Sequence, residues 1–104
     1  MSDDGQRVCD VDDLEDGQGL AADVDGISVA VFRVDGEFYA IQGECTHEGG
    51  PLAEGEVSGT TVTCPWHGAR FDLATGAVKA LPAVEDEPVY EVTVRDGGVF
   101  VRVG

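Results

Sequence analysis

The sequence predicts a small, antiparallel, all-β domain. Asp-Gly pairs stand between apolar or alternating runs at Asp25-Gly26, Asp35-Gly36 and Asp96-Gly97. Such pairs are the strongest short-range signal of two-residue β-hairpins, because both residues tolerate a positive φ. No segment keeps a 3.6-residue hydrophobic period over ten residues, so helix is limited to single turns. At 104 residues the chain has the size of one domain, which we expect to span residues 1–104.

The predicted strands follow one another along the chain, separated by turn residues. Before the middle of the chain we expect strands at 6–10, 20–23, 27–34 and 37–42, and after it at 61–63 and 69–73. Before the third Asp-Gly pair, Tyr90, Val92 and Val94 alternate with polar residues. After it, a second alternating run contains Val99, Val101 and Val103, so the two runs predict the strands of one hairpin. Single helical turns are expected at 11–15 and 52–55.

The charge balance narrows the possible partners. Six basic residues against 21 acidic residues give a formal net charge of −15. Nucleic acids and anionic membranes repel such a surface, and no run has the length of a membrane span. The acidic residues are spread over every segment, which favours adaptation to high salt over a single acidic docking patch.

Two short pairs carry the chemistry of this chain. They are Cys45 with His47 and Cys64 with His67, and they contain both histidines of the sequence. Thiolates and imidazoles presented on two loops at strand ends are metal ligands. They suit either a closed tetrahedral zinc site or an asymmetric two-iron cluster, in which both thiolates bind one iron and both imidazoles the other.

The residues around the two pairs form a specific motif. It reads Cys45-Thr46-His47-Glu48-Gly49-Gly50-Pro51-Leu52 and, after residues 53–63, Cys64-Pro65-Trp66-His67-Gly68. This motif resembles that of the Rieske [2Fe–2S] proteins, and the similarity extends over nearly the whole chain. The resemblance implies a Rieske fold, a three-sheet, barrel-like β-sandwich with a two-loop cluster-binding subdomain at about residues 43–83. It also implies that Leu81-Pro82-Ala83 covers the cluster.

The resemblance assigns one [2Fe–2S] cluster per chain to four ligands. Cys45 and Cys64 would bind the inner iron, and His47 and His67 the outer, more exposed iron. By size and motif the chain resembles the free-standing ferredoxin of a multicomponent dioxygenase. That implies a monomeric electron carrier between a ferredoxin reductase and a terminal oxygenase.

The sequence lacks the residues for the mononuclear iron site of a terminal oxygenase. A mononuclear iron site needs two further histidines and a carboxylate, and no histidine is left to build it. The alternatives are the small Rieske-like subunit of a nitrite reductase and, from another class, a structural zinc module. Cysteine usage favours a reducing cytoplasm, because Cys9 is left without a second cysteine to pair with once Cys45 and Cys64 bind metal. We expect Cys9 to be an apolar core residue of the first strand.

Four positions depart from the high-potential members of the resembled family. Gly50 and Trp66 stand where that branch has two cysteines that form a disulfide. Ala69 and Phe71 stand where it has a serine and a tyrosine whose hydroxyls donate hydrogen bonds to sulfur. Because such bonds stabilise the added electron, their absence predicts a low reduction potential.

Overall fold

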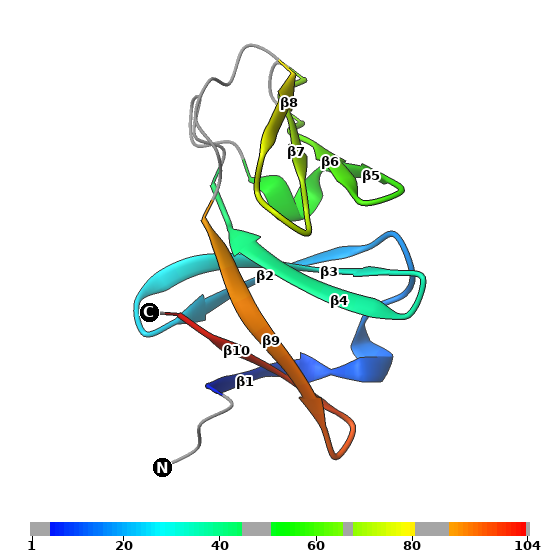
Figure 1. Cartoon of the computed structure of the whole chain (residues 1–104). Coiled ribbons are helices and arrows are strands. Elements are labelled where there is room, and N and C mark those ends of the chain that lie inside the picture. The colour runs from blue at the N-terminus through cyan, green and yellow to red at the C-terminus, as the bar shows by residue number, and fades with distance from the viewer. Residues whose placement is uncertain (1–4, 45–50, 66–67, 81–87, 104) are drawn as a thin grey trace.

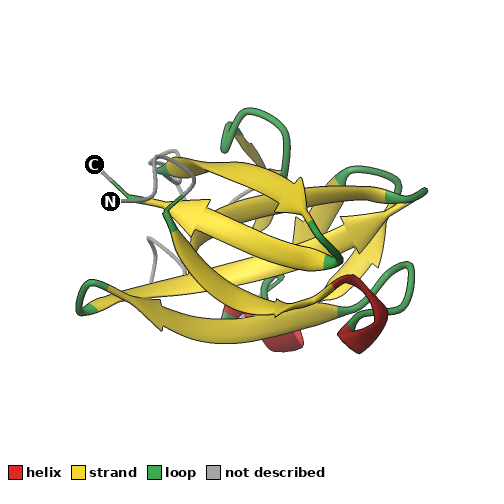
Figure 2. Cartoon of the chain, turned by 90° about the horizontal axis from the view of Figure 1, so that it is seen from below, coloured by secondary structure: helices red, strands yellow, loops and turns green. Residues whose placement is uncertain are grey.

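The computed structural model describes residues 5–44, 51–65, 68–80 and 88–103. Nearly all the regular structure in these ranges is antiparallel β-strand, as predicted (Figures 1 and 2). One sheet has six strands in the order β1 (Gln6–Asp10), β10 (Gly98–Arg102), β9 (Val89–Arg95), β4 (Glu37–Gln42), β3 (Ile27–Val34) and β2 (Gly19–Val24). The other has four, β5 (Glu56–Ser58), β6 (Thr61–Thr63), β7 (Arg70–Asp72) and β8 (Val78–Ala80).

The three Asp-Gly hairpins are present as predicted. Asp25, Asp35 and Asp96 have φ values of 52°, 51° and 52°, and the glycine that follows each of them also has a positive φ. Strand pairing continues directly on either side of each pair, as between Val24 and Ile27. The turn chemistry of two residues therefore sets the register of β2–β3, β3–β4 and β9–β10.

The six-stranded sheet consists of two three-stranded halves that fold over one core. The pairs Ala40–Tyr90 and Ile41–Val89 join β4 to β9, next to a hydrogen bond from the Gln42 N–H to the Pro88 carbonyl oxygen. One hydrophobic cluster draws its buried side chains from both halves, and β1 also contacts β2, which brings the two edges of the sheet together. With the four-stranded sheet, these halves make up the three-sheet, barrel-like arrangement that the sequence predicts.

The central strand β3 is buried on both faces. Val29 and Val31 belong to the core between the two halves, whereas Ala30 and Phe32 belong to a second core under the four-stranded sheet. This explains why the strand is a nearly continuous apolar run instead of an alternating one. The four-stranded sheet, at one end of the molecule in Figure 1, is thereby fixed on the barrel.

Some elements differ in extent from the prediction. The helical turns are short 3-10 turns, η1 (Val11–Asp13) and η2 (Leu52–Glu54), and the strand expected at 69–73 is β7, three residues long. The strands β5 and β8 were not predicted, because each contains a single β-branched residue, whereas all three residues of the predicted strand β6 are β-branched. Within the described ranges, no helix has the length and apolar character needed to cross a membrane.

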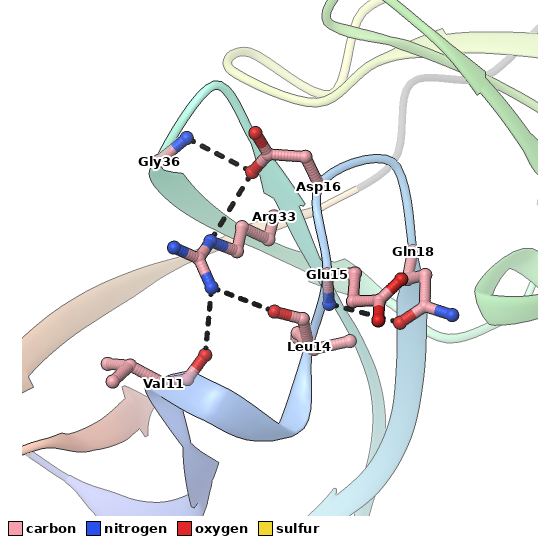
Figure 3. Close-up of polar contacts among 7 residues, drawn as sticks. All are labelled: Val11, Leu14, Glu15, Asp16, Gln18, Arg33 and Gly36. Atoms are coloured by element: carbon pink, nitrogen blue, oxygen red, sulfur yellow. Dashed lines mark hydrogen bonds and ion pairs between the residues drawn. The ribbon is translucent and has the colours of Figure 1, made fainter.

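An arginine fixes the first helical turn to the barrel. Arg33 of β3 donates from Nη1 to the carbonyl oxygens of Val11 and Leu14, at 3.0 and 2.9 Å (Figure 3). Its Nε lies 3.3 Å from Asp16 Oδ1, and its guanidinium stacks 5.4 Å from the centre of the Phe38 ring. These contacts tie the segment from Val11 to Asp16 to β3, which lies about twenty residues further along the sequence.

Candidate metal centre

The loop that carries the second pair is closed at its base by a backbone hydrogen bond. Cys64 directly follows β6, and its N–H donates to the carbonyl oxygen of Ala69 at 2.7 Å. This bond continues the β6–β7 ladder by one step and leaves residues 65–68 as the connection. Gly68 has a φ of 74°, which is favourable for glycine and lets the connection turn back within four residues.

The Cys64 side chain points into an apolar environment. It is 2% exposed and belongs to the same buried cluster as Leu52, Ala69 and Phe71. Pro65 and Gly68, in contrast, are exposed. The loop therefore has a buried thiol at its root, whereas Pro65 and Gly68 lie at the surface.

The loop of the first pair is closed in a comparable way. Glu44 and Pro51 form an antiparallel bridge, and the Leu52 N–H donates to the Gly43 carbonyl oxygen at 3.0 Å. Residues 45–50, which include Cys45 and His47, lie between these two ends. The two ends are thus fixed on the residues that directly follow β4 and on Pro51 and the first residue of η2.

The two loop bases meet in one core. Leu52 ends the first loop and Cys64 begins the second, and both are buried in the hydrophobic cluster beneath the four-stranded sheet. Gly55 fits between them, since a Cβ there would lie 2.3 Å from the Thr63 carbonyl oxygen and 3.0 Å from that of Leu52. The fold therefore brings together the two segments that the sequence analysis paired.

One positioning residue escaped the sequence analysis. The N–H of Gly43 donates to the Ser28 carbonyl oxygen at 2.9 Å, and a Cβ at Gly43 would lie 2.4 Å from Ser28 Oγ. Glycine favours this close approach of the chain to β3 two residues before Cys45, because a Cβ would also lie 3.2 Å from the Ser28 carbonyl carbon. A glycine between a strand and a predicted ligand is the signal that points to it.

Of the four predicted ligands, the structure describes Cys64. Cys45, His47 and His67 lie outside the described residues, as do Gly50, Trp66 and the Leu81-Pro82-Ala83 segment. Accordingly, no group of three or more metal-binding side chains occurs within the described part of the chain. The described part of the site is therefore Cys64 with the side chains that surround it.

The surroundings of Cys64 fit a cysteine-bound iron. A buried thiolate in an apolar layer is the soft, water-shielded donor that iron–sulfur clusters use. Burial also separates this side of the site from solvent, as expected for the inner iron of an asymmetric cluster. Cys9 is also buried, with 8% exposure, but it lies in the other core, with Leu14 and Val99, as predicted for an apolar core residue.

Known proteins similar to this chain include a dioxygenase ferredoxin subunit and part of a longer protein. The 3-phenylpropionate/cinnamic acid dioxygenase ferredoxin subunit of Photorhabdus laumondii is 37% identical over 97 residues, which are 92% of this chain and 91% of that protein. Apoptosis-inducing factor 3 of Homo sapiens is also 37% identical, over 91% of this chain. The chain spans only 16% of the length of the human protein.

Solved structures show the same architecture. The ferredoxin of carbazole 1,9a-dioxygenase from Nocardioides aromaticivorans IC177 has a TM-score of 0.90 and 37% identity, covering 93% of this chain and 95% of that one. The chain matched in a complex of reduced oxygenase and oxidized ferredoxin in carbazole 1,9a-dioxygenase has a TM-score of 0.87, 35% identity and coverages of 92% and 99%. A protein described as an NADH-dependent nitrite reductase small subunit from Mycobacterium tuberculosis has a TM-score of 0.85 and 29% identity, with 95% of each chain covered.

The profile of the Rieske [2Fe-2S] domain family matches residues 4–93. That range includes both mixed pairs and the strands β1 to β8 in full. The cofactor of this family is the [2Fe–2S] cluster that the sequence predicts. The chain therefore belongs to the Rieske [2Fe–2S] family.

Proposed function

We propose that this protein is a one-electron carrier that takes electrons from an NAD(P)H-dependent reductase and passes them to a terminal oxygenase, such as an aromatic-ring dioxygenase. The observation that carries the proposal is the buried Cys64 at the root of a closed loop, in a chain similar to ferredoxin subunits over more than nine-tenths of their length. The solved complex of oxygenase and ferredoxin supports the choice of partner class. We place the carrier in the cytoplasm and expect a monomer.

The proposed ligands are Cys45 and Cys64 for the inner iron and His47 and His67 for the outer iron. A [2Fe–2S] cluster supplies reversible one-electron chemistry when bound. Cys64 holds its sulfur in an apolar layer, and the hydrogen-bonded bases of the two loops support the proposal that the ligands are preorganised. Such preorganisation keeps the geometry change on electron transfer small.

In this proposal, the protein carries electrons and does not itself catalyse the oxygenation. Its two histidines are both used as cluster ligands, so a 2-His-1-carboxylate iron site cannot be built from the remaining residues. Pro65 and Gly68, the described neighbours of residues 66–67, are exposed. A protein partner can therefore approach the second loop at these two residues. The catalytic step therefore belongs to the partner.

Anaerobic purification followed by iron, acid-labile sulfide and zinc analysis tests the cofactor. We expect two irons and two sulfides per chain, and a spectrum bleached by one electron equivalent of dithionite. Cys64→Ser should remove the cluster, whereas the matched variant Cys9→Ser, at a buried cysteine in the other core, should retain it. Stoichiometric zinc without sulfide would establish the structural zinc module instead.

The partner class is tested separately. The likeness to a nitrite reductase small subunit makes that complex the second candidate. The two candidates differ in what co-purifies with the tagged chain from its native host: a Rieske-type oxygenase in one case, and a sirohaem protein in the other. Recovery of the sirohaem protein would overturn the oxygenase assignment while leaving the electron-carrier function intact.

A further inference from the structure

Gly55 lies against the peptide bond that leads into Cys64. The pairing of β5 with β6 places Glu56 opposite Thr63, and by the same register Gly55 is the residue across from Cys64. A Cβ on Gly55 would lie 2.3 Å from the carbonyl oxygen of Thr63, which belongs to that peptide bond. The N–H on the other side of the bond donates to the Ala69 carbonyl oxygen at 2.7 Å. The peptide bond that orients Cys64 is therefore held from both sides.

The same glycine contacts the segment that closes the first ligand loop. The Gly55 N–H donates to the Leu52 carbonyl oxygen at 2.9 Å, and a Cβ on Gly55 would lie 3.0 Å from that oxygen. The Leu52 N–H in turn donates to the carbonyl oxygen of Gly43, at the other end of the first loop. Gly55 thus contacts the end of one ligand loop and the start of the other.

Close packing, and not backbone conformation, requires glycine at this position. Gly55 has a φ of −72° and a ψ of 160°, an extended conformation that any residue adopts. The nearest atoms to a Cβ are two backbone oxygens, which no change of rotamer can move, and Val62 Cγ2 at 2.9 Å. On its other side η2 contacts β2 and β3 of the barrel, where a Cβ on Gly19 would lie 2.5 Å from the Ala53 carbonyl oxygen (Figure 1). A methyl group on Gly55 must therefore displace one loop end relative to the other.

The side chains around this contact are buried. Leu52 and Val62 are fully buried and Cys64 is 2% exposed, and all three belong to the core beneath the four-stranded sheet. Protein interiors are close-packed and transmit strain, because few voids exist that could take up a displaced group. A displacement at Gly55 is therefore passed on to the Cys64 side chain.

We propose that Gly55 is a positioning residue of the cluster site, which sets the separation of the two ligand loops by allowing their ends to approach closely. The inference rests on the proposed carrier function, in which Cys64 of one loop and Cys45 of the other bind the same iron. A site of this kind functions only when its ligands are held to within about 0.5 Å of the required geometry. A side chain larger than that of glycine at position 55 therefore weakens the hold on the cluster.

Two measurements on the cluster-loaded protein test this role: the rate of iron release to a ferrous chelator, and the electron paramagnetic resonance spectrum after reduction with dithionite. Gly55→Ala should release iron about ten- to a hundredfold faster than the wild type, and its g values should shift because they report the geometry around the iron. Val62→Ala removes two methyl groups from the same contact. It should change both measurements in the same way, and it decides the question if Gly55→Ala does not fold.

Gly98→Ala and Val99→Ala are the matched controls, on β10 of the barrel. A Cβ on Gly98 would lie 2.8 Å from the Arg7 side chain, and Val99 is as buried as Val62 but belongs to the other core. Both controls should keep the g values and the iron release of the wild type, even where the melting temperature falls. Equal changes in both cores, or wild-type values in Gly55→Ala and Val62→Ala, would overturn the positioning role and leave the carrier function intact. A wild type that binds no [2Fe–2S] cluster would overturn both.

Discussion

The N–H of Cys64 donates a 2.7 Å hydrogen bond to the carbonyl oxygen of Ala69, and the side chains of both residues are buried in one apolar cluster. The bond joins the predicted ligand to the position where the high-potential Rieske proteins have a serine. Phe71, at the position of their tyrosine, is fully buried in the same cluster. The structure thus places the two residues that lack a hydroxyl in the layer that contains the ligand sulfur.

We expect a low reduction potential, toward the negative end of the range of about −150 to +300 mV of Rieske centres. Ala69→Ser and Phe71→Tyr should each raise it, because a hydroxyl that donates to sulfur stabilises the reduced cluster. Protein-film voltammetry measures the shift. A wild-type value above about +100 mV would contradict the argument.

Two substitutions of the same chemistry serve as controls for that shift. Ala21→Ser adds a hydroxyl on an exposed position of β2, and Phe38→Tyr adds one beside Arg33, in the six-stranded sheet. Neither residue belongs to the core of Cys64. The potential of both variants should equal that of the wild type.

Cys9 should be dispensable for the cluster. Cys9→Ala leaves a small cavity in the barrel core and should cost about 1–2 kcal/mol of the free energy of unfolding, with iron content unchanged. Urea titrations of both proteins measure the cost. Loss of iron in this variant would show that the ligand set is wrong.

The same variant should change the pH dependence of stability. Burial, aided by the nearby Asp13 carboxylate and opposed by Arg7, raises the pKa of the Cys9 thiol above its ordinary value of 9.0. As the pH rises past that value, the unfolded thiol ionises before the folded one, so the wild type loses stability. Cys9→Ala lacks this loss, and the stability difference between the two proteins should shrink at alkaline pH.

Arg33 should stabilise the fold without affecting the cluster. Arg33→Ala leaves the carbonyl oxygens of Val11 and Leu14 without their donor and should cost about 2–4 kcal/mol. The matched change Arg102→Ala removes an exposed ion pair with Glu91 and should cost less than about 1 kcal/mol. Denaturant unfolding compares the two, and the reduction potential should stay constant in both variants.

Salt should stabilise this protein. The net charge of −15 produces self-repulsion at low ionic strength, and screening relieves it. We expect the melting temperature to rise substantially between about 0.05 M and about 2 M potassium chloride, as the Debye length falls to a few ångströms. A melting temperature that is constant over this range would contradict adaptation to high salt.

The sequence by itself determined the features that depend on local chemistry. Asp25, Asp35 and Asp96 adopt positive φ values because Asp and Gly tolerate them, so each hairpin could be predicted from two residues. The mixed Cys and His pairs indicated a metal site for a similar reason, since ligand chemistry is a property of residue type and short spacing, and the residues around them carried the resemblance that chose the [2Fe–2S] cluster over zinc.

Only the tertiary structure decided the relationships between distant segments. The three-residue strands β5 and β8 exist because β6 and β7 provide their partners, and Arg33 finds its acceptors 22 and 19 residues away. Likewise, no local pattern shows that Arg70 faces a hollow with Glu56 while its neighbours Ala69 and Phe71 are buried with Cys64. These relationships arise from long-range strand pairing and packing, whose free energy depends on the whole fold and not on neighbouring residues.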